Sequence, residues 1–106
     1  MPAKSRKQQI QEMLRDDPND TFLHYALAME YVSEGQDEEA VRRFEALFKV
    51  APDYVPAYHQ SGLLLVRLGR TTQAGDILRQ GISMARQQGD QHAVEEMLGL
   101  LSSLEN

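Results

Sequence analysis

The sequence predicts an all-α protein of about six helices, and three observations support this prediction. Apolar residues recur at helical spacing through nearly all of the 106 residues. No stretch alternates apolar and polar residues for long enough to indicate a strand. The apolar segments are separated by helix-ending residues, namely Asp17-Pro18, Gly35, Pro52-Asp53, Gly69 and Gly89-Asp90. The predicted architecture is therefore a series of short helices joined by short turns.

The first two predicted helices cover residues 4–16 and 20–34. Residues Ile10, Met13 and Leu14 form a short apolar stripe on the first, and the following Asp-Pro dipeptide ends it. The second helix carries two adjacent stripes, which are Leu23, Leu27 and Tyr31, and Phe22, Ala26 and Met29. Because two stripes leave little polar surface, we expect this helix to be largely buried.

The third predicted helix covers residues 37–50. Gly35 precedes it at a position that suits a left-handed backbone conformation. Acidic residues then fill the first helical turn, where the positive end of the helix dipole stabilises them. Pro52 ends the helix, since proline cannot continue the backbone hydrogen bonds.

The last three predicted helices cover residues 54–68, 71–87 and 90–104. Their apolar stripes comprise Tyr58, Leu65 and Leu68, then Ile77, Leu78, Ile82 and Ala85, and finally Val94, Met97, Leu98, Leu101 and Leu104. All the connections are only about two to four residues long, so consecutive helices are expected to lie adjacent and antiparallel.

The sequence also repeats itself with a shift of 34 residues. Under this shift the helix-ending residues and the small residues coincide, as do several large apolar ones. The matches include Pro18 with Pro52, Val32 with Val66, Gly35 with Gly69, Ala40 with Ala74, Ala51 with Ala85, Ala28 with Gly62, and Phe44 with Leu78. A helix–turn–helix period of about 34 residues is typical of one family of helical repeats.

This pattern resembles the tetratricopeptide repeat family. The small, aromatic and proline positions of that family are matched by Ala28, Tyr31, Ala40, Phe44 and Pro52, and then by Gly62, Leu65, Ala74 and Leu78. The resemblance implies a right-handed α-solenoid of antiparallel helix pairs. It implies one domain over residues 1–106, in which 4–16 is the helix of a degenerate unit, 21–54 and 55–88 are full repeats, and 90–104 is a capping helix.

Some positions depart from the family pattern. Leu47 and Gly81 stand at the twenty-seventh position of the repeat, where the family usually has a small residue, and Arg86 replaces the expected proline. Without that proline, the helix from Thr71 is expected to be longer than its counterpart. Gly75 and Gly81 each lower helix stability by about 1 kcal/mol relative to alanine.

Composition excludes several classes of function. The net charge of −5 disfavours nucleic acid and anionic membrane surfaces as partners. The absence of cysteine excludes disulfides, thiolate nucleophiles and cysteine-based zinc sites. No apolar run reaches the roughly 18 residues of a membrane helix, and the basic start MPAKSRKQQIQ lacks the apolar segment of a secretory signal. We therefore expect a cytoplasmic protein.

The sequence gives little support for a catalytic or metal-binding site. The three histidines are His24, His59 and His92, and we expect no carboxylate to share a short motif with any of them, which argues against a metal site. The acidic run of Asp37, Glu38 and Glu39 lies in an exposed turn, where a sheltered acid–base site is not expected. Phosphate-binding loops and nucleophile motifs are absent from the sequence. We expect neither enzymatic activity nor a metal or cofactor.

The resemblance places function in a concave groove, lined by the first helix of each repeat. The corresponding residues are Phe22, Tyr25, Met29, Val32, His59, Leu63, Val66, Arg67 and Met97. Most of them are apolar, which favours binding an apolar or amphipathic peptide or helix of a protein partner. The alternatives are a structural self-association domain that uses the same groove as a dimer interface, and a groove filled by the chain's own terminal segment.

Some family members bind the acidic tails of heat-shock chaperones with a clamp of basic and amide residues. Tyr25, Met29 and Gln60 occupy the clamp positions here, and none of them is basic. We therefore predict that this chain does not bind such tails, although Arg67 could still pair with a single carboxylate.

Overall fold

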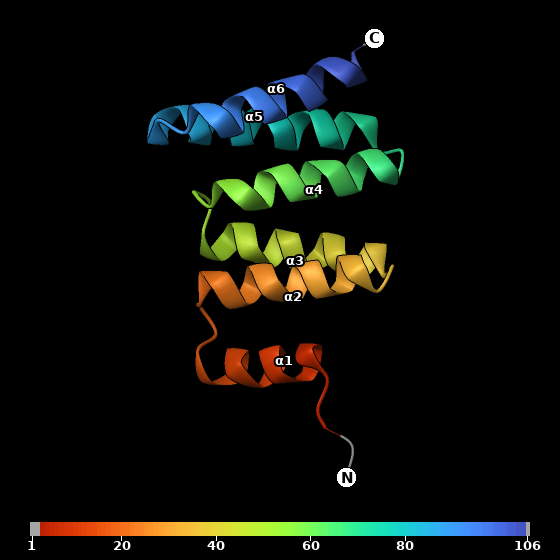
Figure 1. Cartoon of the computed structure of the whole chain (residues 1–106), viewed down its shortest axis with the longest axis vertical. Helices are drawn as coiled ribbons and strands as arrows, with labels where there is room; N and C mark the ends of the chain where they lie inside the picture. The colour runs from red at the N-terminus through yellow and green to blue at the C-terminus, as the bar shows by residue number, and fades with distance from the viewer. Residues whose placement is uncertain (1–2, 106) are drawn as a thin grey trace. The chain divides into compact units, whose positions relative to one another are not determined.

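The computed structural model describes residues 3–105, and the regular secondary structure in that range is entirely helical (Figure 1). The six helices are α1 (Arg6–Asp16), α2 (Thr21–Ser33), α3 (Asp37–Val50), α4 (Val55–Arg67), α5 (Thr71–Gln88) and α6 (Gln91–Leu104). Each observed boundary lies within two residues of the predicted one. The predicted all-α helical repeat fold is confirmed.

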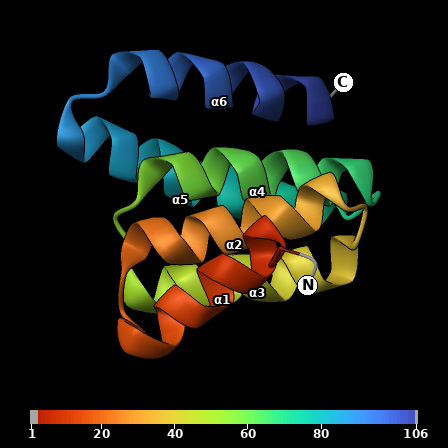
Figure 2. The same ribbon diagram turned by 60° about the horizontal axis from the view of Figure 1, so that its bottom comes forward.

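The helices form two compact units. Unit 1, Met1–Pro52, contains α1, α2 and α3, and unit 2, Asp53–Asn106, contains α4, α5 and α6. Within each unit consecutive helices run antiparallel, as the views in Figures 1 and 2 show. The expectation of a single domain over residues 1–106 stays a prediction.

The core of unit 1 lies between α2 and α3. Helix α2 buries Leu27 and Ala28, and α3 buries Ala40, Phe44 and Leu47. The two alanines let the helix backbones approach closely, while Phe44 and the leucines fill the space beside them. This pairing is the one that the 34-residue repeat predicts for the first full repeat.

Two glycines set the packing of unit 2. A methyl group on Gly62 of α4 would lie 2.5 Å from Cδ2 of Leu78, so α4 and α5 are in close contact there. A methyl group on Gly81 of α5 would lie 2.5 Å from Cβ of Tyr58 and 2.7 Å from Sδ of Met97. Helix α5 therefore approaches both α4 and α6 at Gly81, and this packing offsets the low helix propensity of the glycine.

Three turns share one hydrogen-bonding pattern around a left-handed glycine. The φ angles of Gly35, Gly69 and Gly89 are 74°, 76° and 72°. In each turn the amide after the glycine donates a hydrogen bond across the helix end, from Gln36 to Tyr31 O, from Arg70 to Leu65 O and from Asp90 to Ala85 O. These bonds satisfy carbonyls that would otherwise lack a donor, and they confirm the conformation predicted for Gly35.

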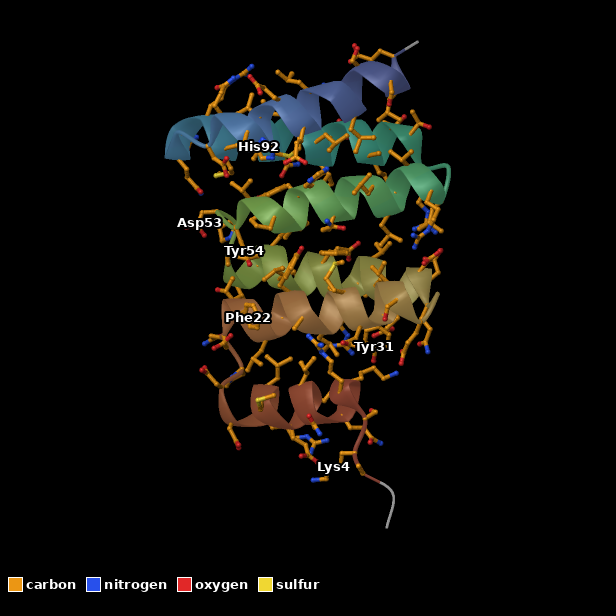
Figure 3. The ribbon with its side chains drawn as sticks, viewed as in Figure 1. Lys4, Phe22, Tyr31, Asp53, Tyr54 and His92 are labelled. Atoms are coloured by element: carbon orange, nitrogen blue, oxygen red, sulfur yellow. The ribbon has the colours of Figure 1, made fainter. Side chains whose placement is uncertain are left out.

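Helix α5 is longer than its counterpart α3, as the sequence predicted. It has 18 residues against 14, because Arg86 allows the helix to continue until Gly89 ends it. In the added turn, Nε2 of Gln88 donates a hydrogen bond of 2.6 Å to the carbonyl oxygen of Asp53, a residue labelled in Figure 3. As a result, α6 begins 36 residues after α4 (91 − 55), and the 34-residue spacing does not extend to it.

Candidate protein-binding surface

In unit 1, the predicted groove residues lie along one flank of α2. Phe22, Tyr25, Met29 and Val32 follow a spacing of three, four and three residues, which places them on the same side of a helix. Phe22 is 67% exposed and stands at the start of the helix (Figure 3), whereas the other three are partly buried. Phe22 is thus the side chain of this flank with the most apolar surface available to a partner.

In unit 2, the predicted residues lie along one flank of α4. His59, Leu63, Val66 and Arg67 follow a spacing of four, three and one residues. Leu63 is 40% exposed, Arg67 is exposed, and His59 and Val66 are partly buried. This flank therefore combines apolar contact area with a guanidinium and an imidazole that could orient a bound segment.

The prediction for Met97 is wrong. Its side chain is fully buried in unit 2, and its sulfur approaches Gly81 of α5. The error arises because residue 97 was aligned with Leu63 by a shift of 34. When the residues are counted from the start of each helix, the shift is 36, and Met97 corresponds to Ser61, which is also buried. Met97 is a core residue and offers no surface to a partner.

The histidines have ordinary structural surroundings. Nε2 of His24 lies 2.7 Å from the carbonyl oxygen of Pro18, and Nε2 of His92 lies 3.1 Å from Oε1 of Glu96. We did not predict the pairing of His92 with Glu96 from the sequence, although residues four apart on a helix are neighbours on its surface. Within residues 3–105, no group of three histidine, aspartate or glutamate side chains could hold a metal ion.

The acidic run lies in the first turn of α3, where the sequence placed it. Oε2 of Glu39 accepts hydrogen bonds from Nε and Nη2 of Arg42 at 2.9 and 2.7 Å, and its Oε1 accepts one from Nε of Arg43 at 3.0 Å. The hydrogen bond from Arg42 is the main reason that the pKa of Glu39 is lowered, and the charge of Arg43 adds to the effect. A carboxylate held ionised in this way stabilises the helix start and is poorly suited to proton transfer.

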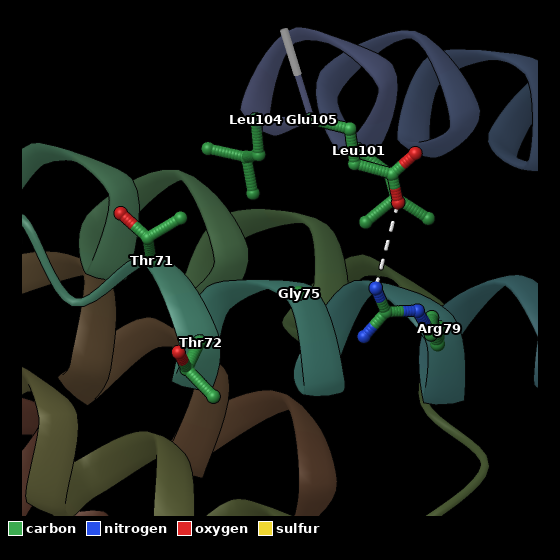
Figure 4. A pocket seen from close by; sticks show the side chains of 7 residues that line it. All are labelled: Thr71, Thr72, Gly75, Arg79, Leu101, Leu104 and Glu105. Carbon is green, nitrogen blue, oxygen red and sulfur yellow. Dashed lines mark hydrogen bonds and ion pairs between the residues drawn. The ribbon is translucent and has the colours of Figure 1, made fainter.

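An open pocket of about 220 Å³ lies between α5 and α6 (Figure 4). Its lining includes Leu101 and Leu104 of α6 and Gly75 of α5, which contributes no side chain. At one end, the guanidinium of Arg79 lies 3.5 Å from both Asp76 and Glu105. Sequence reasoning did not find this pocket, because it depends on how far two helices separate rather than on a motif.

The antiparallel helix pairs and the recurring left-handed turns define a helical repeat protein. Two segments, residues 23–54 and 55–88, match the model of the tetratricopeptide repeat family, and together they make up more than half of the chain. The protein belongs to the tetratricopeptide repeat family. Within residues 3–105, no helix combines the length and the apolar character needed to cross a membrane.

Solved structures agree with this assignment. A tetratricopeptide repeat domain protein from Salinibacter ruber is 38% identical with a TM-score of 0.77, and the match covers 82% of this chain and 98% of that one. A protein from Bordetella parapertussis is 23% identical with a TM-score of 0.83, covering 97% and 90%. The TPR2B domain of yeast Sti1, in complex with pHsp70, is 15% identical with a TM-score of 0.86, covering 93% and 79%. The last two show a shared fold. No curated protein matches the chain significantly.

Proposed function

We propose that the chain is a non-enzymatic interaction module that binds an apolar or amphipathic peptide or helix of a protein partner. Tetratricopeptide repeat domains generally mediate protein–protein interaction, and the TPR2B domain of Sti1 was solved in complex with pHsp70. These facts support a protein partner as the class of ligand. The cytoplasmic location that we propose rests on the sequence.

The exposure of Phe22 and Leu63 is the observation that carries this proposal. Each is a large apolar side chain left in water on the predicted binding flank of its own unit. Fully burying a side chain of this size is worth about 1.5–3 kcal/mol, so a partner that covers it gains affinity. Met29 lies further along the same flank of α2, and its flexible thioether can adapt to segments of different shape.

We expect no binding to the acidic tails of chaperones. Tyr25, Met29 and Gln60 offer no Lys or Arg at the clamp positions, so a row of carboxylates would be left without charged partners. Fluorescence anisotropy with a labelled acidic tail peptide measures this directly. Saturable binding at micromolar peptide would show that the clamp comparison is misleading for this chain.

An affinity capture from native lysate tests the binding flanks. We expect Phe22→Ser combined with Leu63→Ser to lose the specific partner, because both changes remove apolar contact area without touching the core. The matched control combines Met13→Ser and Leu98→Ser, since these residues are 47% and 39% exposed on α1 and α6, outside the proposed flanks. If the control loses the partner and the flank variant retains it, the assignment of the surface is wrong.

Self-association through the same residues is the alternative use of this surface, and sedimentation velocity over a concentration series distinguishes it. A monomer at high micromolar concentration supports binding of a different protein. If the protein is a dimer and the variant with Phe22→Ser and Leu63→Ser is a monomer, these flanks form a dimer interface.

A further inference from the structure

Helix α1 is joined to α2 by two ion pairs. Nε of Arg6 lies 2.8 Å from Oε1 of Glu30, and Nζ of Lys7 lies 2.8 Å from Oε1 of Glu34. The two cations are adjacent in the first turn of α1, while the two carboxylates are near the end of α2. The contact between the two helices is therefore strongly polar at this end.

Tyr31 of α2 extends the same contact. The Lys7 ammonium lies 4.7 Å from the centroid of the Tyr31 ring, and Nε2 of Gln11 lies 3.4 Å from the Tyr31 hydroxyl. Arg43 of α3 also approaches the ring, with its guanidinium carbon 5.6 Å from the centroid. Figure 3 shows Tyr31 beside α1. A single aromatic ring thus takes part in contacts from both helices that flank α2.

The apolar part of the contact is small. Ile10 is the one buried residue of α1, whereas α3, the other helix that flanks α2, has three buried residues. Met13 is 47% exposed, although the repeat aligns it with Leu47 of α3, which is fully buried. An isolated helix of 11 residues is marginal in water, so α1 depends on this docking for its order.

We propose that α1 is an electrostatically latched helix, which opens from α2 when its ion pairs are weakened while α2 and α3 stay packed. Opening exposes Ile10, Tyr31 and the two carboxylates of α2, and it converts unit 1 from three packed helices to two. The α2–α3 pair is expected to stay packed, because its contact is more extensive than that between α1 and α2 and each of its helices buries three residues. Local opening of this kind is usual for elements with few buried contacts.

The two ion pairs should differ in how strongly salt weakens them. Arg6 is largely exposed, so the attraction to Glu30 is screened when the Debye length falls from about 30 Å at 0.01 M salt to about 3 Å at 1 M. The Lys7 side chain is only 23% exposed, so its pair with Glu34 is screened less. Salt alone therefore weakens the latch, and removing the carboxylates should release it fully.

Amide hydrogen exchange measured by NMR on the whole chain tests the proposal. Between about 0.01 M and 1 M sodium chloride, we expect exchange in α1 to accelerate about tenfold, with α3 unchanged. Helix α6 is an internal reference, because it docks on α5 through buried Val94 and Met97. If α1 exchanges at the same rate as α2 and α3 at both salt concentrations, or is already unprotected at low salt, the latch does not exist.

A pair of variants separates the latch from general salt effects. Glu30→Gln with Glu34→Gln should accelerate α1 exchange at low salt beyond the rate seen in the parent at high salt, because both ion pairs are then removed, and should abolish the salt dependence of α1 exchange. The matched control is Asp76→Asn with Glu105→Gln, which removes the two ion pairs of Arg79 in unit 2 and should leave α1 protected. Unchanged α1 exchange in the double variant would overturn the proposal, and so would equal acceleration in the control.

Discussion

Two helical glycines in unit 2 have opposite surroundings. Gly81 faces Tyr58 and Met97 at distances that leave no space for a methyl group, while nothing approaches Gly99 within 4 Å. Gly81→Ala should lower the free energy of unfolding by about 1–3 kcal/mol, because the Cβ of Tyr58 cannot move without its backbone. Gly99→Ala should raise it by about 0.4–1 kcal/mol, because alanine restricts the unfolded chain. Urea unfolding of both variants measures this, and equal effects would contradict the packing at Gly81.

The sequence predicts local roles of residues better than roles that depend on distant partners. Gly35 was identified as a left-handed helix terminus because its neighbours in the chain determine that conformation. From the sequence, Gly81 was predicted only to lower the stability of its helix. Its close contacts are with Tyr58 and Met97, which lie 23 and 16 positions away in the chain (81 − 58 and 97 − 81). No local pattern contains that information.

At the scale of single elements, the stability that Glu39 contributes at the start of α3 should depend on pH. The lowered pKa of Glu39 means that its contribution to stability is present above the ordinary glutamate pKa of about 4.3 and is lost as the pH falls through the folded-state value. Glu39→Gln should therefore destabilise the protein at pH 7 and have little effect near pH 3. Urea unfolding at the two pH values checks this, and the same loss at both would mean that charge is not the cause.

Helix α5 shows where prediction of an element succeeds and where its consequences are missed. The replacement of proline by Arg86 correctly predicted a longer helix. Its additional turn then displaces α6 from the 34-residue spacing, and this converts Met97 from an expected surface residue to a core residue. An insertion inside one repeat changes which residues of the next helix face the core, even when the type of every element is predicted correctly.

At the scale of the whole molecule, the fold could be predicted because its determinants recur. Pro18 and Pro52, Gly35 and Gly69, and the small residues at 28, 40, 62 and 74 all repeat with the same period. The binding flank is a harder problem, because an apolar residue on a helix is compatible with both core and surface. Only the structure separates Phe22 and Leu63, which are exposed, from Met97, which is not.

The most direct measurement of the central claim is the affinity of the captured partner, determined by isothermal titration calorimetry. We predict that Phe22→Ser with Leu63→Ser weakens binding at least tenfold, because the proposal makes these two residues the main apolar anchors, and losing an anchor costs more than about 1 kcal/mol. The control pair Met13→Ser and Leu98→Ser should leave the dissociation constant unchanged. Equal affinities for the flank variant and the parent protein, with both folded by circular dichroism, would contradict the claim that these flanks of α2 and α4 bind the partner.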